Sequence, residues 1–457
     1  MPAESIETNS PARHPSFGEA FRFWLKLGFI SFGGPTGQIA IMHAELVEKK
    51  RWISEERFLH ALNYCMLLPG PEAQQLAIYV GWLLHKVRGG IVAGVAFVLP
   101  AFFLILGLSY VYVTYGEVPW VSGIFYGLSA AVIGIVAAAV IRIGSKALRN
   151  PVMYVVAGAA FLAIFVFHGP FPLIVIVAGL IGLIAGRRWP GPSSISQGHG
   201  EMGQKAALSD DGPAGEHTHI SFRRSAKVLV VGLAVWFIPL ALVALWRGRG
   251  DVLTQQAWFF SKAAVVTFGG AYAVLAYINQ AAVTQFGWLL PAQMVAGLGL
   301  AESTPGPLIM VTEFVGFVGA YQNPGGLDPV VSGVLGAIVV TWATFAPCFL
   351  WIFLGAPFIE HLRTNVRLTN ALTTITAAIV GVVLNLALWF GIQTLFNQVR
   401  DVNVFGGPVP VPVWSSLDLF ATSVAAISFF GLWKLRWKVI PVVLVSAAAG
   451  LVYQVFS

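Results

Sequence analysis

Two lysines stand inside apolar stretches of the sequence, and a hydroxyl residue and two glycines follow each of them at the same spacing. The members of these motifs are Lys26, Ser31, Phe32, Gly33 and Gly34 in the first and Lys262, Thr267, Phe268, Gly269 and Gly270 in the second. A lysine in an apolar membrane segment is costly and usually functional, and hydroxyls donate hydrogen bonds. Two such sets, brought together, can bind a tetrahedral dianion. The alternative is that both lysines extend to the membrane interface.

Two Pro-Gly-Pro motifs lie downstream of the lysine motifs. Their residues are Pro69, Gly70 and Pro71, and Pro305, Gly306 and Pro307. Proline removes a backbone donor and blocks the continuation of a helix, so these motifs and the two glycine pairs predict four helix breaks. A helix that begins at a break points free N–H groups and the positive end of its dipole at a bound anion. The sequence therefore predicts an anion site lined by helix N-termini.

Three carboxylates lie in or beside the segments that break. They are Glu72, Glu302 and Glu313, and none of them has an acidic counterpart at the repeat position, which is occupied by Leu308, Met66 and Ala77 respectively. Burial raises the pKa of a carboxyl group toward neutrality, which suits a proton carrier. Helix capping or a salt bridge to a lysine is the alternative for each.

These motifs belong to an internal duplication. A shift of 236 residues aligns about 50 residues without a gap, so that Phe23 falls on Phe259 and Trp52 on Trp288. After an insertion near 319–329 the shift becomes 247, and Pro100 falls on Pro347. Glycine and proline motifs that recur at one offset predict two homologous halves.

The composition indicates a membrane protein. Of the 457 residues, 57% are hydrophobic and 10% are charged, against about 25% charged residues in a soluble domain. Apolar runs of roughly 20 residues, enough to cross a bilayer, recur along the chain, and no cleavable signal peptide is evident. The net charge of +7 is explained by basic loops rather than by nucleic-acid binding. The two cysteines have no metal-ligand spacing, so we expect no metal and no cofactor.

The basic residues predict opposite orientations for the two halves, because short loops rich in Lys and Arg stay in the cytoplasm. Basic residues follow the first apolar segment at 49–57 and recur at 86–88, whereas the counterpart loops 279–289 and 321–328 contain none. Further along the chain the pattern reverses. The segment 58–84 then enters and leaves by one face, as a pair of half-helices.

We therefore predict an all-α polytopic membrane protein with two inverted-topology repeats and four re-entrant broken-helix hairpins. The nine full spans are expected near 89–113, 119–141, 152–168, 170–186, 227–246, 330–357, 369–395, 414–431 and 437–456. A count of 13 conventional crossings is the alternative. The expected divisions are a disordered cytoplasmic tail (1–16), a first repeat (17–186), a polar cytoplasmic linker (187–226), a connecting transmembrane helix (227–246) and a second repeat (247–457).

Inverted repeats with broken helices are a recurring transporter design, with the substrate near the midplane. The stretches Ser31–Pro35, Leu67–Pro71, Thr267–Gly270 and Thr304–Pro307, together with Trp52, resemble the long two-domain form of the chromate transporter family over nearly the whole chain. The resemblance implies gradient-driven chromate efflux and chromate resistance in a bacterial inner membrane, with the Phe-Gly-Gly and Pro-Gly-Pro motifs at the positions named above.

Several alternatives remain at this point. Sulfate has the shape and charge of chromate, so a carrier of sulfate or another oxyanion, an importer, and an anion channel all stay open. No phosphate-binding loop, metal-binding helix motif or nucleophile elbow occurs, so the sequence does not predict an enzyme. The expected partners are the oxyanion and membrane lipid but no nucleic acid, and a homodimer stays open.

Overall fold

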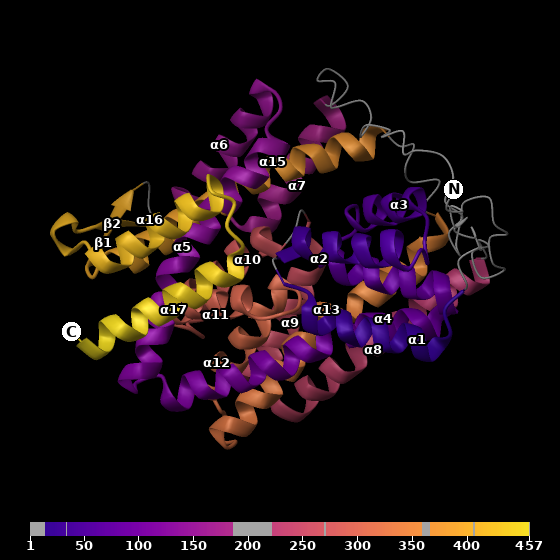
Figure 1. The fold of residues 1–457 in the computed structure, drawn as a ribbon, viewed down its shortest axis with the longest axis horizontal. Helices are drawn as coiled ribbons and strands as arrows, with labels where there is room; N and C mark the ends of the chain where they lie inside the picture. The colour runs from indigo at the N-terminus through magenta and orange to yellow at the C-terminus, as the bar shows by residue number, and fades with distance from the viewer. Residues whose placement is uncertain are drawn as a thin grey trace, which may run out of the picture.

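The computed structural model describes residues 14–32, 34–185, 222–268, 271–358, 366–404 and 407–456 (Figure 1). Within these ranges, six helices are long and apolar enough to cross a membrane. They are α4 (Glu72–Tyr115), which is interrupted by non-helical backbone at His85 and Lys86, α5 (Pro119–Ala147), α8 (Phe222–Arg247), α13 (Pro329–Gly355), α15 (Val366–Leu395) and α17 (Val439–Phe456). These helices identify a polytopic membrane protein.

Three further predicted spans correspond to shorter apolar helices. They are α6 (Pro151–Phe165), α7 (Phe171–Ala185) and α16 (Leu419–Trp433), each of 15 residues. At 1.5 Å per residue such a helix is about 22 Å long, short of the ~30 Å hydrocarbon core. Tight turns cut these helices short, as at His168, where φ is 50°. Nine of the described helices therefore lie at the positions of the nine predicted spans. Six of them are long enough to cross the membrane.

The four predicted helix breaks are confirmed. In the first half, α1 (Phe17–Ile30) ends before α2 (Gly34–His43), and α3 (Glu55–Cys65) ends before α4. In the second half, α9 (Val252–Val266) ends before α10 (Ala271–Asn279). There, α11 (Pro291–Ser303) is followed by the 3₁₀ turn η4 (Leu308–Met310) and α12 (Val311–Gln322).

The duplication extends to local backbone geometry. A π-helix, η1 (Ala44–Lys49), follows α2, and a second, η3 (Gln280–Gln285), follows α10 at the same offset of 236 residues. π-Helices are rare and occur mostly as single turns. The aromatic pair Phe23–Trp52 also recurs as Phe259–Trp288, with ring centroids 5.1 and 5.8 Å apart.

The two halves are interleaved rather than packed as separate bodies. Helix α5 of the first half packs against α16 and α17 of the second, and α15 of the second packs against α6 and α7 of the first. Figure 1 shows α17 lying alongside α5 near the C-terminus. The central layer is formed by α4 with α12 and α13, and by α13 with α9.

One element departs from the all-α prediction. The stretch 397–412, expected as a loop, contains an antiparallel hairpin of β1 (Val399–Val404) and β2 (Gly407–Pro412). Prolines at 408, 410 and 412 alternate along β2, where the missing N–H groups face away from β1, as proline in an edge strand requires. Short 3₁₀ turns, η5 (Ala356–Phe358) and η6 (Trp414–Ser416), complete the described elements.

The predicted tail and linker are described only at their ends. Of the tail, residues 14–16 are described. The Pro15 carbonyl oxygen lies 3.0 Å from Nε2 of His85 on α4, and Ser16 is the N-cap of α1. Of the linker, residues 222–226 form the first turn of α8. The remainder of both segments lies outside the described residues.

Arg247, the last residue of α8, is held by an acidic side chain and two backbone carbonyls. Its guanidinium lies 2.9 Å from the Asp251 carboxylate and donates to the carbonyls of Pro324 and Gly325 at 3.2 and 2.7 Å. Asp251 in turn caps α9 through the Leu253 N–H. One side chain therefore joins the connecting helix, the second half and the inserted loop.

Replacing Arg247 by methionine should lower the stability of the protein by roughly 1–3 kcal/mol, because the Asp251 carboxylate and two carbonyls lose their charged donor. Thermal unfolding of the detergent-purified protein measures this effect. Arg249→Met is the matched control, since Arg249 is exposed. Equal melting temperatures for both variants would contradict the role given to Arg247.

Candidate anion site at the four helix breaks

Two equivalent hydrogen bonds cross between the halves and join the four breaks in two pairs, and these breaks and bonds form the candidate centre. The Gly70 N–H donates to the Thr267 carbonyl at 2.9 Å, and the Gly306 N–H donates to the Ser31 carbonyl at 2.8 Å. Gly70 and Gly306 are repeat partners, and so are Ser31 and Thr267. Each Pro-Gly-Pro motif is therefore hydrogen-bonded to the hydroxyl residue of the lysine motif in the opposite half.

Glycine is required at the centre of both Pro-Gly-Pro motifs. Gly70 and Gly306 have φ of 118° and 108°, in the region that side chains disfavour. A Cβ on Gly306 would lie 2.3 Å from Ala101 Cβ, and one on Gly70 would lie 3.0 Å from Cys348 Sγ. Ala101 and Cys348 are repeat partners at the offset of 247, so each motif packs against the proline-containing helix of the other half, α4 for Gly306 and α13 for Gly70.

The flanking prolines start the next helices. Pro71 is the N-cap of α4, and Pro307 is the N-cap of η4. The Pro69 carbonyl accepts a hydrogen bond of 2.7 Å from Gln75 Nε2. In the glycine pairs, Gly34 begins α2 with φ of 66°, whereas Gly33, Gly269 and Gly270 lie outside the described residues.

The hydroxyls at the two breaks differ in their partners. Ser31 is fully buried, and its Oγ has no hydrogen-bond partner among the described residues. Thr267 is also buried, but its Oγ1 donates to the Ala263 carbonyl at 2.5 Å. The next residues, Phe32 and Phe268, are half-buried and have equivalent backbone bonds to positions 30 and 266. A free buried donor is therefore available at Ser31.

Gln38 is a polar residue at the contact between Gly306 and Ser31, and the sequence analysis did not identify it. It is fully buried on α2, and its Nε2 donates to the Gly306 carbonyl, while its Oε1 has no partner in the described part of the chain. The repeat position is Val274. A glutamine in an apolar helix, with an apolar counterpart, was the signal available in the sequence.

The three carboxylates lie in different surroundings. Glu72 is the first residue of α4, where the helix dipole favours a negative charge. Glu302 accepts a hydrogen bond from the Tyr272 hydroxyl. Glu313 is fully buried on α12, with neither carboxyl oxygen bonded to a described residue. Within the described ranges, none of the three forms a salt bridge to a lysine.

The two lysines are not brought to the breaks. Lys26 is exposed on α1 and lines a surface pocket with Glu45 and Lys50. Lys262 is exposed on α9, with its Nζ 5.8 Å from the centroid of the Trp258 ring. The part of these lysines in substrate binding stays a prediction.

Broken helices that contact each other between two homologous halves are a recurring feature of membrane transporters. The chromate transporter family matches residues 18–183 and 254–451, in two segments that correspond to the two halves. The chain therefore belongs to the chromate transporter family, in its long two-domain form, and it is a transporter rather than an enzyme.

Curated relatives agree with this assignment. The chain is 30% identical to the chromate transport protein of Cupriavidus metallidurans over 79% of both chains. It is 29% identical to a probable chromate transport protein of Synechococcus elongatus, over 84% of this chain and 87% of the relative. It is also 29% identical to the chromate transport protein of Pseudomonas aeruginosa, over 98% and 96% respectively. No solved structure matches the chain.

Proposed function

We propose that this protein is a secondary active transporter that exports chromate across the bacterial inner membrane. The relatives named above are chromate transport proteins. The observation that carries the proposal is the pair of crossed hydrogen bonds, Gly70 to Thr267 and Gly306 to Ser31. They join the four helix breaks in two crossed pairs, each with one break from each half.

In the proposed architecture the two halves have opposite orientations, and the segments that break are re-entrant. Equivalent bonds exchanged between repeat partners are what a two-fold axis through the centre would produce. The loops rich in Lys and Arg in one half and poor in them in the other support the inversion. The interleaving of α5 and α15 with helices of the opposite half fits the same symmetry.

Chromate is proposed to bind where α2, α4 and α10 begin. The Gly70 and Gly306 amides already donate across the centre, so the anion must use other donors. The first turns of these helices supply free N–H groups and positive dipole ends. The Ser31 hydroxyl adds a donor with no protein partner among the described residues. The glycines leave room for an ion to approach the backbone.

Sulfate or another oxyanion carrier is the alternative substrate class, because this geometry selects charge and shape rather than the central atom. An anion channel is the alternative mechanism. Glu313, buried with both oxygens unbonded in the described part of the chain, favours a carrier, because such a group can take up and release a proton during transport.

Inside-out membrane vesicles test the proposal. Energised vesicles that contain the protein should accumulate radiolabelled chromate, and an uncoupler should abolish the accumulation. Excess sulfate, which has the same charge and shape, should compete with chromate for uptake. Clear movement of sulfate without concentrative uptake of chromate would overturn the chromate assignment, and uptake that only dissipates a chromate gradient would identify a channel.

Ser31→Ala should raise the KM for chromate roughly 10- to 100-fold, because a hydrogen bond to a charged group contributes about 1.5–3 kcal/mol. Thr267→Ala should have a smaller effect, since its hydroxyl already donates to Ala263. Vesicle uptake at varied chromate concentration measures both values. An equal KM in Ser31→Ala and the wild type would remove Ser31 from the site.

Lys26 and Lys262 complete the proposed anion site, and they are tested by alanine substitution in the same assay. Both side chains are exposed, so they would contribute only by moving toward the breaks during transport. We expect a clear loss of uptake in either variant. Normal uptake in both would assign the lysines to the membrane interface and leave the helix N-termini to bind the anion.

A further inference from the structure

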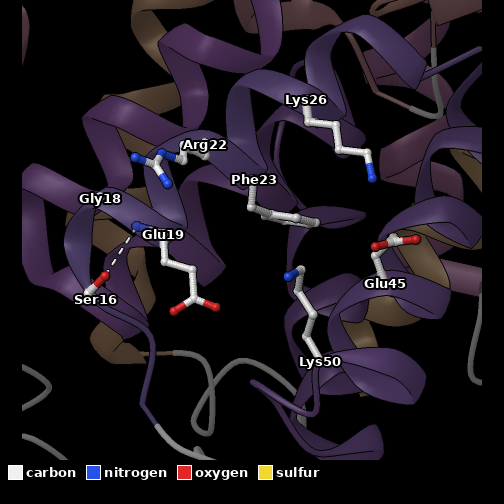
Figure 2. Close-up of a pocket in the computed structure, with 8 residues that line it drawn as sticks. All are labelled: Ser16, Gly18, Glu19, Arg22, Phe23, Lys26, Glu45 and Lys50. Atoms are coloured by element: carbon white, nitrogen blue, oxygen red, sulfur yellow. Dashed lines mark hydrogen bonds between the residues drawn. The ribbon is translucent and has the colours of Figure 1, made fainter.

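A basic pocket of about 400 Å³ lies beside α1 and η1, apart from the buried centre (Figure 2). Its cationic side chains are Arg22, Lys26 and Lys50, and its carboxylates are Glu19 and Glu45. Phe23 lies in the middle of the pocket. Lys26 and Lys50 direct their ammonium groups toward the space beside Phe23 and Glu45 (Figure 2). Positive charge therefore converges on one hollow of the surface.

Lys50 is held in place by aromatic rings. Its Nζ lies 4.9 Å from the centroid of Trp52 and 5.8 Å from that of Phe23, within the range of a cation–π contact. The side chain is half-buried. A cation fixed in this way loses less freedom when it binds an anion than a mobile surface lysine does.

The carboxylates of the pocket do not cancel its cations. Glu45 forms a salt bridge with Lys49, which does not line the pocket, and the Lys49 Nζ lies 2.6 Å from Glu45 Oε1. The hydrogen bond from Lys49 lowers the pKa of Glu45, and the charges of Lys26 and Lys50 lower it further. In the pocket three cations accompany two carboxylates, and one of these, Glu45, is already paired with Lys49, so positive charge remains for a ligand.

The second half lacks this pocket's charges. At the offset of 236, Arg22 becomes Trp258, Glu45 becomes Ala281 and Lys50 becomes Phe286. Phe286 stacks on Trp288 at 4.4 Å with an interplanar angle of 6°, in place of the Lys50 contact with Trp52. Only Lys262 is kept. An aromatic cluster thus replaces the basic pocket, although the fold around it is duplicated.

We propose that this pocket is a capture site for a tetrahedral oxyanion, present on one face of the membrane only. The inference rests on the proposed function, in which the halves are inverted and residues 49–57 face the cytoplasm. Cytoplasmic oxyanions then concentrate at the pocket before they reach the breaks, since the excess positive charge of a cleft raises the local anion concentration and the association rate. Except for Lys262, the matching positions of the second half do not carry these charges, which favours loading from the cytoplasm.

Lysine acetylation tests the pocket without transport. Purified protein in neutral detergent is treated with acetic anhydride, with and without sulfate as the probe, and the products are read by mass spectrometry. Sulfate should slow the acetylation of Lys26 and Lys50 but not that of Lys146, an exposed lysine on α5. The same rates with and without sulfate would overturn the proposal. Protection by phosphatidylglycerol micelles but not by sulfate would also overturn it and assign the pocket to a lipid headgroup.

Transport kinetics then test the role of the pocket. Arg22→Gln and Lys50→Gln should each raise the KM for chromate roughly two- to fivefold at low ionic strength, as expected for loss of one exposed charge. The maximal rate should be unchanged, and high salt should remove the difference by screening. Lys146→Gln is the control. Sulfate protection without a change in KM would refute the capture role, while protection in a protein that does not transport chromate would refute only the proposed substrate.

Discussion

Gly306→Ala should abolish transport by preventing the correct assembly of the centre. The left-handed φ of 108° would be imposed on alanine, at a cost of about 1–3 kcal/mol. The new Cβ would also lie 2.3 Å from Ala101 Cβ, so the Gly306 N–H would be pushed off the Ser31 carbonyl. We expect little folded protein in detergent and no chromate uptake in vesicles.

The substitution at Gly70 should be milder than that at Gly306. There the new Cβ would meet the end of the Gln75 side chain at 2.8 Å and Cys348 Sγ at 3.0 Å, and the glutamine can move. Ala101→Gly should partly rescue Gly306→Ala by removing the clash while the strain remains. Gly107→Ala is the control, because no atom lies within 4 Å of the added Cβ. Wild-type yield and uptake in Gly306→Ala would contradict the crossed-bond arrangement.

Glu313→Gln should fold but should no longer accumulate chromate against a gradient. A charged carboxylate without a partner is very costly in a buried site, so we expect Glu313 to hold a proton in this conformation and to lose it in another. Glutamine keeps the shape but carries no titratable proton. The expected result is loss of uncoupler-sensitive accumulation, while exchange of chromate for chromate continues.

Glu302→Gln is the matched comparison for Glu313→Gln. Glu302 already accepts a hydrogen bond from Tyr272, which ties it to a structural contact, so this variant should retain most of the accumulation. Proton movement followed with a pH-sensitive dye should disappear with chromate accumulation in Glu313→Gln only. Full accumulation in Glu313→Gln would exclude that carboxyl group as the proton carrier.

The helix breaks could be predicted from the sequence, because proline and a left-handed glycine stop a helix by local sterics alone. Their crossed contacts could not. The Gly70–Thr267 and Gly306–Ser31 bonds join residues far apart in the chain, and apolar periodicity carries no information about which backbone group meets which. The unpaired hydroxyl of Ser31 depends on the same packing.

The spacing of polar and apolar residues in α1 indicated that Lys26 is exposed. The apolar residues around it favoured a buried position instead. Arg22, Lys26 and Phe29 are exposed at i, i+4 and i+7 of α1, whereas Phe23, Trp24 and Leu27 are buried. One helix face therefore carries both cations. The hairpin at β1 and β2 was missed for a different reason, because three prolines in β2 usually count against a strand.

Because helices of each half pack against the other half, some contacts of the first half can form only after the second half has been synthesised. The surfaces of α5 that α16 and α17 cover are complete early in translation, yet their partners are the last helices to be made. Until release from the ribosome, α5 must be shielded by lipid or by the insertion machinery. A chain stopped after α15 would keep all four breaks, yet the surfaces of α5 that α16 and α17 cover would still lack their protein partners.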